Sequence, residues 1–226
     1  GRQALLEPIE WTDDGWYVAK GGDLGTPLAK PSGESVGAHG MALSDSFDGE
    51  RLGHQWSFFN PAQDEYARLS FGNGAMTLQG KGRTPRDTSP LTAIAGDKAY
   101  QFEVEMEIEP GAIGGALLFY SDRLYVGVGS NGDRTVMHRY GVERPTQGLP
   151  AGKGGRFWLR VTNNQHIVTF HTSTDGRTWV KYPTQMEVSG YHHNVAGGFL
   201  ALKPAIYAAG DGKVHFRSFR YRALDY

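Results

Sequence analysis

The chain has 226 residues, 39% of them hydrophobic and 21% charged, which suits one large domain with a sizeable core. A formal net charge of −1 argues against nucleic acid or an anionic membrane as the main partner. The absence of cysteine excludes disulfides, thiolate metal sites and thiol nucleophiles. No apolar run approaches ~20 residues, so no membrane-spanning helix is predicted.

Residues 1–19 are predicted to form a β-hairpin. Ile9 and Trp11 precede the turn residues 12–15, after which apolar residues resume. Because an isolated two-stranded hairpin is marginal in water, we expect this one to belong to a larger body. Residues 20–40 are rich in Gly, Pro and Ser and are predicted to be a linker, which marks a domain boundary.

Beyond the linker, the strongest strand signal lies at residues 100–109. Apolar residues occupy every even position from Tyr100 to Ile108, and Gln or Glu occupies the odd positions. Side chains alternate faces along a β-strand, so this segment has one apolar face and one polar face. The apolar face requires a second layer to cover it.

Turn signals recur from residue 41 onward at the spacing of a β-sandwich. We therefore predict an all-β fold, an antiparallel jelly-roll-like sandwich over residues 41–226, and assign no helix. The Gly72-Asn73-Gly74 turn is a strong hairpin signal because Asn and Gly tolerate positive φ. Residues 141–155 are expected to form an exposed loop. Other strands are expected at 43–47, 54–59, 67–71, 75–79, 116–120, 124–129, 134–140, 157–162, 167–172, 178–182, 198–202 and 214–221.

Several motifs resemble those of glycoside hydrolase family 43, in its β-xylosidase and α-L-arabinofuranosidase members. Residues 1–11, with Asp13-Asp14-Gly15-Trp16, resemble the end of that family's five-bladed catalytic β-propeller. The cues that resemble its C-terminal concanavalin A-like sandwich are residues 44–49, 52–56, 173–179 and 216–221. The resemblance implies remnant propeller strands at 1–19, a linker at 20–40 and a sandwich at 41–226.

The resemblance also implies a function. Glycoside hydrolysis needs two carboxyl groups across the scissile bond, ~6.5–9.5 Å apart in an inverting enzyme. In family 43 these groups come from earlier propeller blades, so this chain is expected to supply no catalytic residue. The implied role is an accessory C-terminal region of a glycosidase acting on xylan or arabinoxylan. Its sandwich would pack on the N-terminal β-propeller and shape the entrance to the active site, with pentose oligosaccharides as ligands of the parent.

Three alternatives stay open at this point. The sandwich is a free-standing carbohydrate-binding module for xylan or arabinoxylan, a purely structural brace on the propeller, or, last, a self-sufficient hydrolase. The carboxylates that the last alternative would use gain no support from their surroundings in the sequence, since none is placed in a desolvated pocket. They are Asp45, Asp48, Glu50, Asp64 and Glu65. The sequence does not fix the compartment, and a secreted or periplasmic location is favoured.

Arg2 is the first of three candidate substrate-binding residues. In the family, an arginine in the matching Gly-Arg-Glu/Gln motif contacts the terminal sugar and the carboxylate network. A guanidinium offers a fork of donors that suits both kinds of oxygen. The alternative for Arg2 is an exposed side chain with no role in this chain.

His192 and His193 are the other two candidates. In family 43 xylosidases, a sandwich loop near this point reaches over the catalytic pocket with an aromatic residue. Alignment of residues 195–199 with that segment leaves Val195 at the aromatic position. Tyr191, His192 or His193 would therefore have to take over the sealing role. Adjacent strand residues point to opposite faces, so the two histidines are not expected to chelate one metal ion.

A structural calcium ion often stabilises concanavalin A-like sandwiches, and Asp45, Asp48 and Asp211 are candidate oxygen donors. Arg217, however, falls where related sandwiches commonly carry an acidic ligand. Its positive charge would repel a cation and pair with a nearby carboxylate instead. We therefore assign no metal ligand.

Aromatic rings are common platforms for sugars, which makes the aromatic residues between 56 and 66 candidates for that role. Trp56 and Phe58 share one face of a strand, and Phe59 lies on the other. Most of this group, which includes Tyr66, is expected to lie in the core. Trp179, which follows a turn, is expected to be a packing anchor.

Overall fold

The structure, a computed structural model, describes residues 7–20, 32–33, 40–146 and 155–225. The chain divides into two compact units, Gly1–Ala38 and His39–Tyr226. Arg2 and most of the expected linker lie outside the described residues. None of the helices within the described ranges is long and apolar enough to cross a membrane.

The described part of the first unit is a β-hairpin. Strand β1 (Ile9–Trp11) pairs antiparallel with β2 (Tyr17–Ala19). The turn closes with a hydrogen bond from the Thr12 N–H to the Trp16 carbonyl at 2.7 Å. Gly15 takes φ +84°, a conformation that glycine adopts without steric cost.

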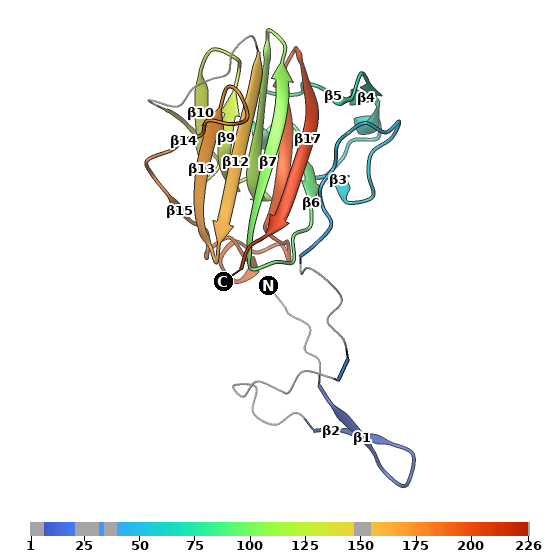
Figure 1. Cartoon of the computed structure of the whole chain (residues 1–226). Coiled ribbons are helices and arrows are strands. Elements are labelled where there is room, and N and C mark those ends of the chain that lie inside the picture. Colours follow the sequence, from blue (N-terminus) through green and yellow to red (C-terminus); the bar gives the residue numbers. More distant parts are fainter. Residues whose placement is uncertain (1–6, 21–31, 34–39, 147–154, 226) are drawn as a thin grey trace. The chain divides into compact units, whose positions relative to one another are not determined.

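The second unit consists of two antiparallel β-sheets that lie face to face (Figure 1). The seven-stranded sheet has the order β11-β10-β9-β8-β16-β6-β3. In that order its strands are Val142–Pro145, Thr135–Arg139, Leu124–Ser130, Ala112–Ser121, Lys203–Gly210, Leu91–Ala93 and Trp56–Phe58.

The eight-stranded sheet has the order β14-β13-β12-β7-β17-β5-β4, with β15 also paired to β13. In that order its strands are Val180–Lys181, Ile167–Ser173, Arg156–Asn164, Ala99–Ile108, Lys213–Ala223, Ala75–Gln79 and Leu69–Gly72, and β15 is Met186–Glu187. Three short helical turns complete the described elements: η1 (Glu65–Arg68), η2 (Pro85–Asp87) and α1 (His193–Ala196).

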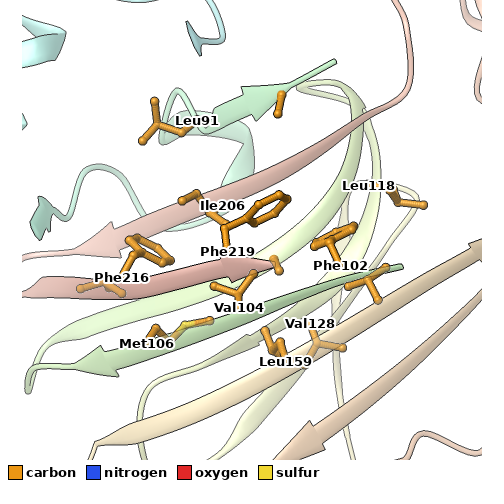
Figure 2. Close-up of a cluster of buried hydrophobic side chains, with 14 of the residues drawn as sticks. Leu91, Phe102, Val104, Met106, Leu118, Val128, Leu159, Ile206, Phe216 and Phe219 are labelled. Atoms are coloured by element: carbon orange, nitrogen blue, oxygen red, sulfur yellow. The ribbon is translucent and has the colours of Figure 1, made fainter. Parts of the chain in front are cut away.

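Strand β7 lies between β12 and β17, and its alternation determines which face is inside. Phe102, Val104 and Met106 are fully buried, while the glutamates between them face outward. Figure 2 shows these side chains packed against Leu118 and Ile206 and other apolar residues of the facing sheet. The predicted all-β antiparallel sandwich is confirmed, and β7 matches the strand expected at residues 100–109.

The β4–β5 hairpin confirms the turn predicted at residues 72–74. Asn73 and Gly74 both take positive φ, +53° and +66°. Two successive left-handed residues match the right-handed twist of the flanking strands, which is why Asn-Gly favours this turn.

Two expected strands are absent. Within residues 43–47 only Asp45 pairs, in an isolated bridge with Phe219, because Phe47 takes φ +52° and leaves the extended conformation. Residues 198–202 form no strand, because Gly198 and Phe199 both have positive φ. The strand begins later, at Lys203, and runs to Gly210 as β16.

Strand β11 and helix α1 are among the elements that the sequence did not predict. Residues 142–145, expected to be loop, form β11 at the edge of the seven-stranded sheet and pair with β10. The helix α1 was not assigned, since it is a single turn of four residues. Both elements are too short to carry a periodic pattern of apolar residues.

Candidate functional site

The candidate site is the segment 190–200, called the 190–200 loop, which precedes β16 and contains α1. His192 is the N-cap of α1, and its Nδ1 accepts the N–H of Asn194 at 3.1 Å. The helix stops after one turn because Gly197 takes φ +70°. Side-chain acceptors at the N-cap satisfy a helix N–H that has no backbone partner, so His192 fixes where the turn begins.

Phe199 projects from the end of this loop and is 69% exposed. Its φ is +50°, an unusual conformation for a bulky residue. Two contacts with His193 support it. The His193 Nδ1 accepts the Phe199 N–H at 3.1 Å, and the two rings stack with centroids 3.6 Å apart and planes inclined by 20°. The loop therefore holds an aromatic ring outward in a defined position.

The 190–200 loop is anchored to the sandwich on its inner side. The Tyr120 hydroxyl on β8 donates a hydrogen bond to the Gly197 carbonyl. The buried ring of Tyr191 lies 6.0 Å from the ring of Tyr140, which follows β10. Burial raises the pKa of the Tyr191 phenol, so this ring acts as a neutral packing group. Val195, like Phe199, is 69% exposed, and these two are the large apolar side chains that the loop exposes.

The predicted site residues fall into three groups. His192 and His193 lie together in the 190–200 loop, but the Nδ1 of each is engaged by a backbone N–H. Val195 is exposed at the expected position without an aromatic ring. Arg2 lies outside the described residues. The exposed aromatic residue of the loop is Phe199, four residues after Val195, and the Gly197-Gly198 pair before it is the sequence signal for its sharp outward turn.

Two of the candidate catalytic carboxylates, Asp45 and Glu65, have structural partners instead. Glu65 is buried against Arg68 and Lys81, whose Nζ lies 2.6 Å from Glu65 Oε2. Burial alone would raise the pKa of Glu65, but the hydrogen bonds from Lys81, the Ala62 N–H and Arg68 lower it overall. A carboxyl group held ionised in this way is unsuited to act as the proton donor of a glycosidase.

The candidate calcium donors either accept hydrogen bonds from other groups or do not cluster around one point. Asp45 accepts hydrogen bonds from the Phe47 N–H and from the side chains of Gln55 and Trp56. In the part of the chain that the structure describes, no three His, Cys, Asp or Glu side chains gather into a group that could hold a metal ion. Arg217 donates to Glu107 Oε2 at 2.9 Å. The described donors thus do not fit a calcium ion, and the absence of a structural calcium ion stays a prediction.

The outer face of the seven-stranded sheet carries a second, smaller apolar cluster. Phe119, Tyr125 and Tyr207 are buried there, although they point away from the main core. The segment around η2 covers part of this face, because the Tyr125 hydroxyl lies against the Thr84 side chain and the Arg86 backbone. These rings are therefore packed against the protein itself.

The aromatic residues around β3 divide as expected. Trp56 and Phe58 lie in the main core, and Phe59 packs against the second cluster. Tyr66 is the exception because it is 55% exposed and touches Phe58 edge-on. The Arg160 guanidinium lies 3.9 Å from the Trp179 ring centroid, so that ring serves as a packing surface.

The hairpin of the first unit carries an exposed apolar face. The pairing of Ile9 with Ala19 and of Trp11 with Tyr17 places all four side chains on one face. Ile9 is 50% exposed, Trp11 67% and Tyr17 59%. The rings of Trp11 and Tyr17 contact each other edge-on, with centroids 5.9 Å apart.

Comparison with known proteins identifies this arrangement of sheets. The family described as "Beta xylosidase C-terminal Concanavalin A-like domain" matches residues 44–222. The chain belongs to this family of domains. The match spans the sandwich from the first bridge, at Asp45, almost to the end of β17.

Several relatives resemble this chain over a longer stretch than residues 44–222. The non-reducing end alpha-L-arabinofuranosidase BoGH43B of Bacteroides ovatus is 25% identical over 251 residues, covering 100% of this chain and 46% of the relative. The GH43 protein BlXynB of Bacillus licheniformis superposes with a TM-score of 0.76 at 23% identity, and xylan beta-1,4-xylosidase of Bacillus halodurans with 0.75 at 17% identity. Each superposition covers 96% of this chain and 46% of the solved structure. This chain thus spans less than half the length of these relatives.

Proposed function

We propose that this chain is the C-terminal part of a glycoside hydrolase of family 43 that acts on xylan or arabinoxylan. In that role the sandwich packs on an N-terminal catalytic β-propeller, and the 190–200 loop shapes the entrance of the active site. The catalytic acid and base belong to the N-terminal part. The activities named for the relatives, arabinofuranosidase and xylosidase, support this substrate class.

The observation that carries the proposal is the exposed ring of Phe199. Exposure of a large apolar side chain to water is unfavourable, and Phe199 also has a strained left-handed backbone conformation. Such strain commonly marks a functional position. An aromatic face stacks well on the C–H face of a pyranose and excludes water from it. Phe199 is thus suited to close one side of a sugar pocket that another domain supplies.

The hairpin β1–β2 supports the same assembly. Its apolar face, with Trp11 and Tyr17, is more exposed than a stable isolated hairpin would tolerate. An adjoining strand or propeller blade of a larger body would bury this apolar face. This observation equally supports the second candidate, a purely structural brace on the propeller.

The carbohydrate-binding module receives less support. Such a module stacks sugars on exposed aromatic rings, whereas Phe119, Tyr125 and Tyr207 on the outer face of the seven-stranded sheet are buried. Titration of the chain with xylobiose and arabinose-substituted oligosaccharides tests this alternative. Binding by the chain alone would favour the module over an accessory role.

The test of the main proposal uses the full reading frame that encodes this chain. We expect a propeller sequence upstream, and hydrolysis of nitrophenyl xyloside or arabinofuranoside by the complete polypeptide. Phe199→Ala should raise KM for short oligosaccharides roughly tenfold, the scale of one lost apolar contact of 1–3 kcal/mol. Tyr66→Ala, which removes a comparably exposed aromatic ring on another part of the sandwich, is the control. An upstream region without a propeller, or a Phe199→Ala enzyme with unchanged kinetics, would contradict the proposal.

A further inference from the structure

Two neighbouring imidazoles hold the 190–200 loop through the same atom. The Nδ1 of His192 lies 3.1 Å from the backbone nitrogen of Asn194, and the Nδ1 of His193 lies 3.1 Å from that of Phe199. A backbone N–H can only donate, so each Nδ1 is the acceptor. Each neutral ring therefore carries its proton on Nε2, and the tautomer follows from the geometry.

We propose that His192 and His193 are positioning residues that hold Phe199 outward only while both rings are unprotonated, which makes the 190–200 loop a pH-sensitive element. The effect of this pH response on enzyme activity rests on the proposed function, in which Phe199 contacts a sugar pocket. The device itself depends only on contacts within this chain. In this role the two imidazoles do not bind sugar directly. They act by holding Phe199 and α1 in place.

Protonation adds a hydrogen to Nδ1 and turns both acceptors into donors. At His192 the N-cap of α1 is lost, because an N–H group then faces the Asn194 N–H. At His193 the contact that supports the φ of +50° at Phe199 is lost in the same way. An imidazolium is still attracted to the phenyl face, but this attraction does not restore an acceptor for the Phe199 N–H. Lower pH should therefore loosen the loop backbone even where the rings stay close.

The other charged and titratable groups around the loop do not produce the same response. The neighbouring side chains are Tyr120 on β8, Arg139 at the end of β10, Tyr140 just after it, and Tyr191. Unlike histidine, tyrosine and arginine ordinarily change charge only well above pH 8. Glu187 on β15 lies near Tyr191, and hydrogen bonds from Ser189 hold its pKa below its usual value, so it stays ionised. His166, another imidazole, lies near Glu187, so it requires a control.

The experiment is an NMR titration of the 226-residue chain from about pH 8 to about pH 5, the range over which histidine ordinarily changes charge. At the upper end the ring nitrogen shifts of His192 and His193 should report the Nε2–H tautomer. The amide signals of Asn194 and Phe199 should move with the same midpoints as the rings. Their exchange protection, corrected for intrinsic rates, should fall roughly tenfold, the scale of one lost hydrogen bond.

The matched variant is the double substitution His192→Asn with His193→Asn. The Asn Oδ1 lies close to where the histidine Nδ1 was, accepts the same N–H groups and does not titrate, and Asn is itself a favoured N-cap. In this variant the signals of Asn194 and Phe199 should no longer follow pH, whereas His166→Asn should leave the wild-type response intact. The proposal is overturned if the wild-type amides ignore the titration of the rings, or if the double variant follows pH as the wild type does. Neither outcome depends on sugar binding or on a catalytic domain, so the proposed function is tested separately.

Discussion

Lys81 Nζ lies 2.6 Å from Glu65 Oε2, and this ion pair ties the segment before η2 to η1. Arg68 binds the other oxygen of the same carboxylate and also donates to the carbonyls of Gln79 and Thr88. Glu65 is 1% exposed, so two cations converge on one buried acceptor. This cluster fixes the covering segment over β16 on the outer face of the seven-stranded sheet.

Glu65→Gln should strongly destabilise the sandwich. The substitution keeps the shape of the side chain but leaves Arg68 and Lys81 without their counter-charge, and breaking a buried pair in this way costs about 3–5 kcal/mol. Urea unfolding followed by tryptophan fluorescence measures the change. Glu50→Gln, at an exposed bend, should change the free energy of unfolding by less than about 0.5 kcal/mol. Equal effects of the two substitutions would contradict the role given to Glu65.

The stability of the sandwich should fall as the pH is lowered below neutrality. Burial lowers the pKa of His138 to about 3, and its Nε2 lies 2.6 Å from the Tyr207 hydroxyl. In the unfolded chain this histidine binds a proton near pH 6.5, so between that pH and about 3 the unfolded state holds more protons than the folded state. His138 therefore gives its full stability above pH 6.5 and loses it progressively below, at up to about 1.4 kcal/mol per pH unit.

Urea unfolding at a series of pH values checks this dependence. His138→Leu removes the titrating group and should flatten the curve between about pH 6 and pH 4, even though the variant is less stable throughout. The lowered pKa of Glu65 acts in the same direction but mainly at lower pH, because its contribution is lost only as the pH falls through its depressed folded pKa. If His138→Leu had the same slope as the wild type near pH 5, burial of a neutral His138 would not be the cause.

The sandwich could be predicted from sequence because its central strands carry a strong period-two pattern. In β7 each apolar residue from Tyr100 to Ile108 is buried, and the Asn73-Gly74 turn has the backbone conformation that its residues favour. Strands without this alternation were harder to predict. Strand β16 contains Pro204 and is buried on both faces, so its residues do not alternate between apolar and polar.

The resemblance to family 43 pointed to the 190–200 loop as the candidate site. The roles of its side chains depend on backbone angles that the sequence does not encode locally. The outward aromatic ring is Phe199, which requires a left-handed residue and two imidazole acceptors to stay in place. Nothing in the residue types alone distinguished a sugar contact from a backbone acceptor at these histidines.

Gly129→Ala should destabilise the outer cluster of the seven-stranded sheet. A Cβ built at Gly129 would overlap the Tyr207 hydroxyl, which is fixed by its hydrogen bond with His138. Overpacking of this kind costs about 1–3 kcal/mol. Gly72→Ala is the matched control, because a Cβ there meets nothing within 4 Å and its φ is ordinary. Thermal unfolding should show a clearly lower Tm for Gly129→Ala alone, and a Tm equal to that of Gly72→Ala would mean that Tyr207 moves freely.

Calcium should not stabilise the described sandwich. The Arg217 guanidinium lies 2.9 Å from Glu107, and a cation near this pair would be repelled by the fixed positive charge. Asp45, meanwhile, is already saturated by the Phe47 N–H and by the side chains of Gln55 and Trp56. An ion present at a hundred times its dissociation constant would add about 2.7 kcal/mol to the free energy of unfolding, which corresponds to several degrees in Tm. We expect equal Tm values in millimolar calcium and in chelator, measured by scanning calorimetry with magnesium as the control for ionic strength. A rise of several degrees that is specific to calcium would mean that oxygen ligands other than these hold the ion.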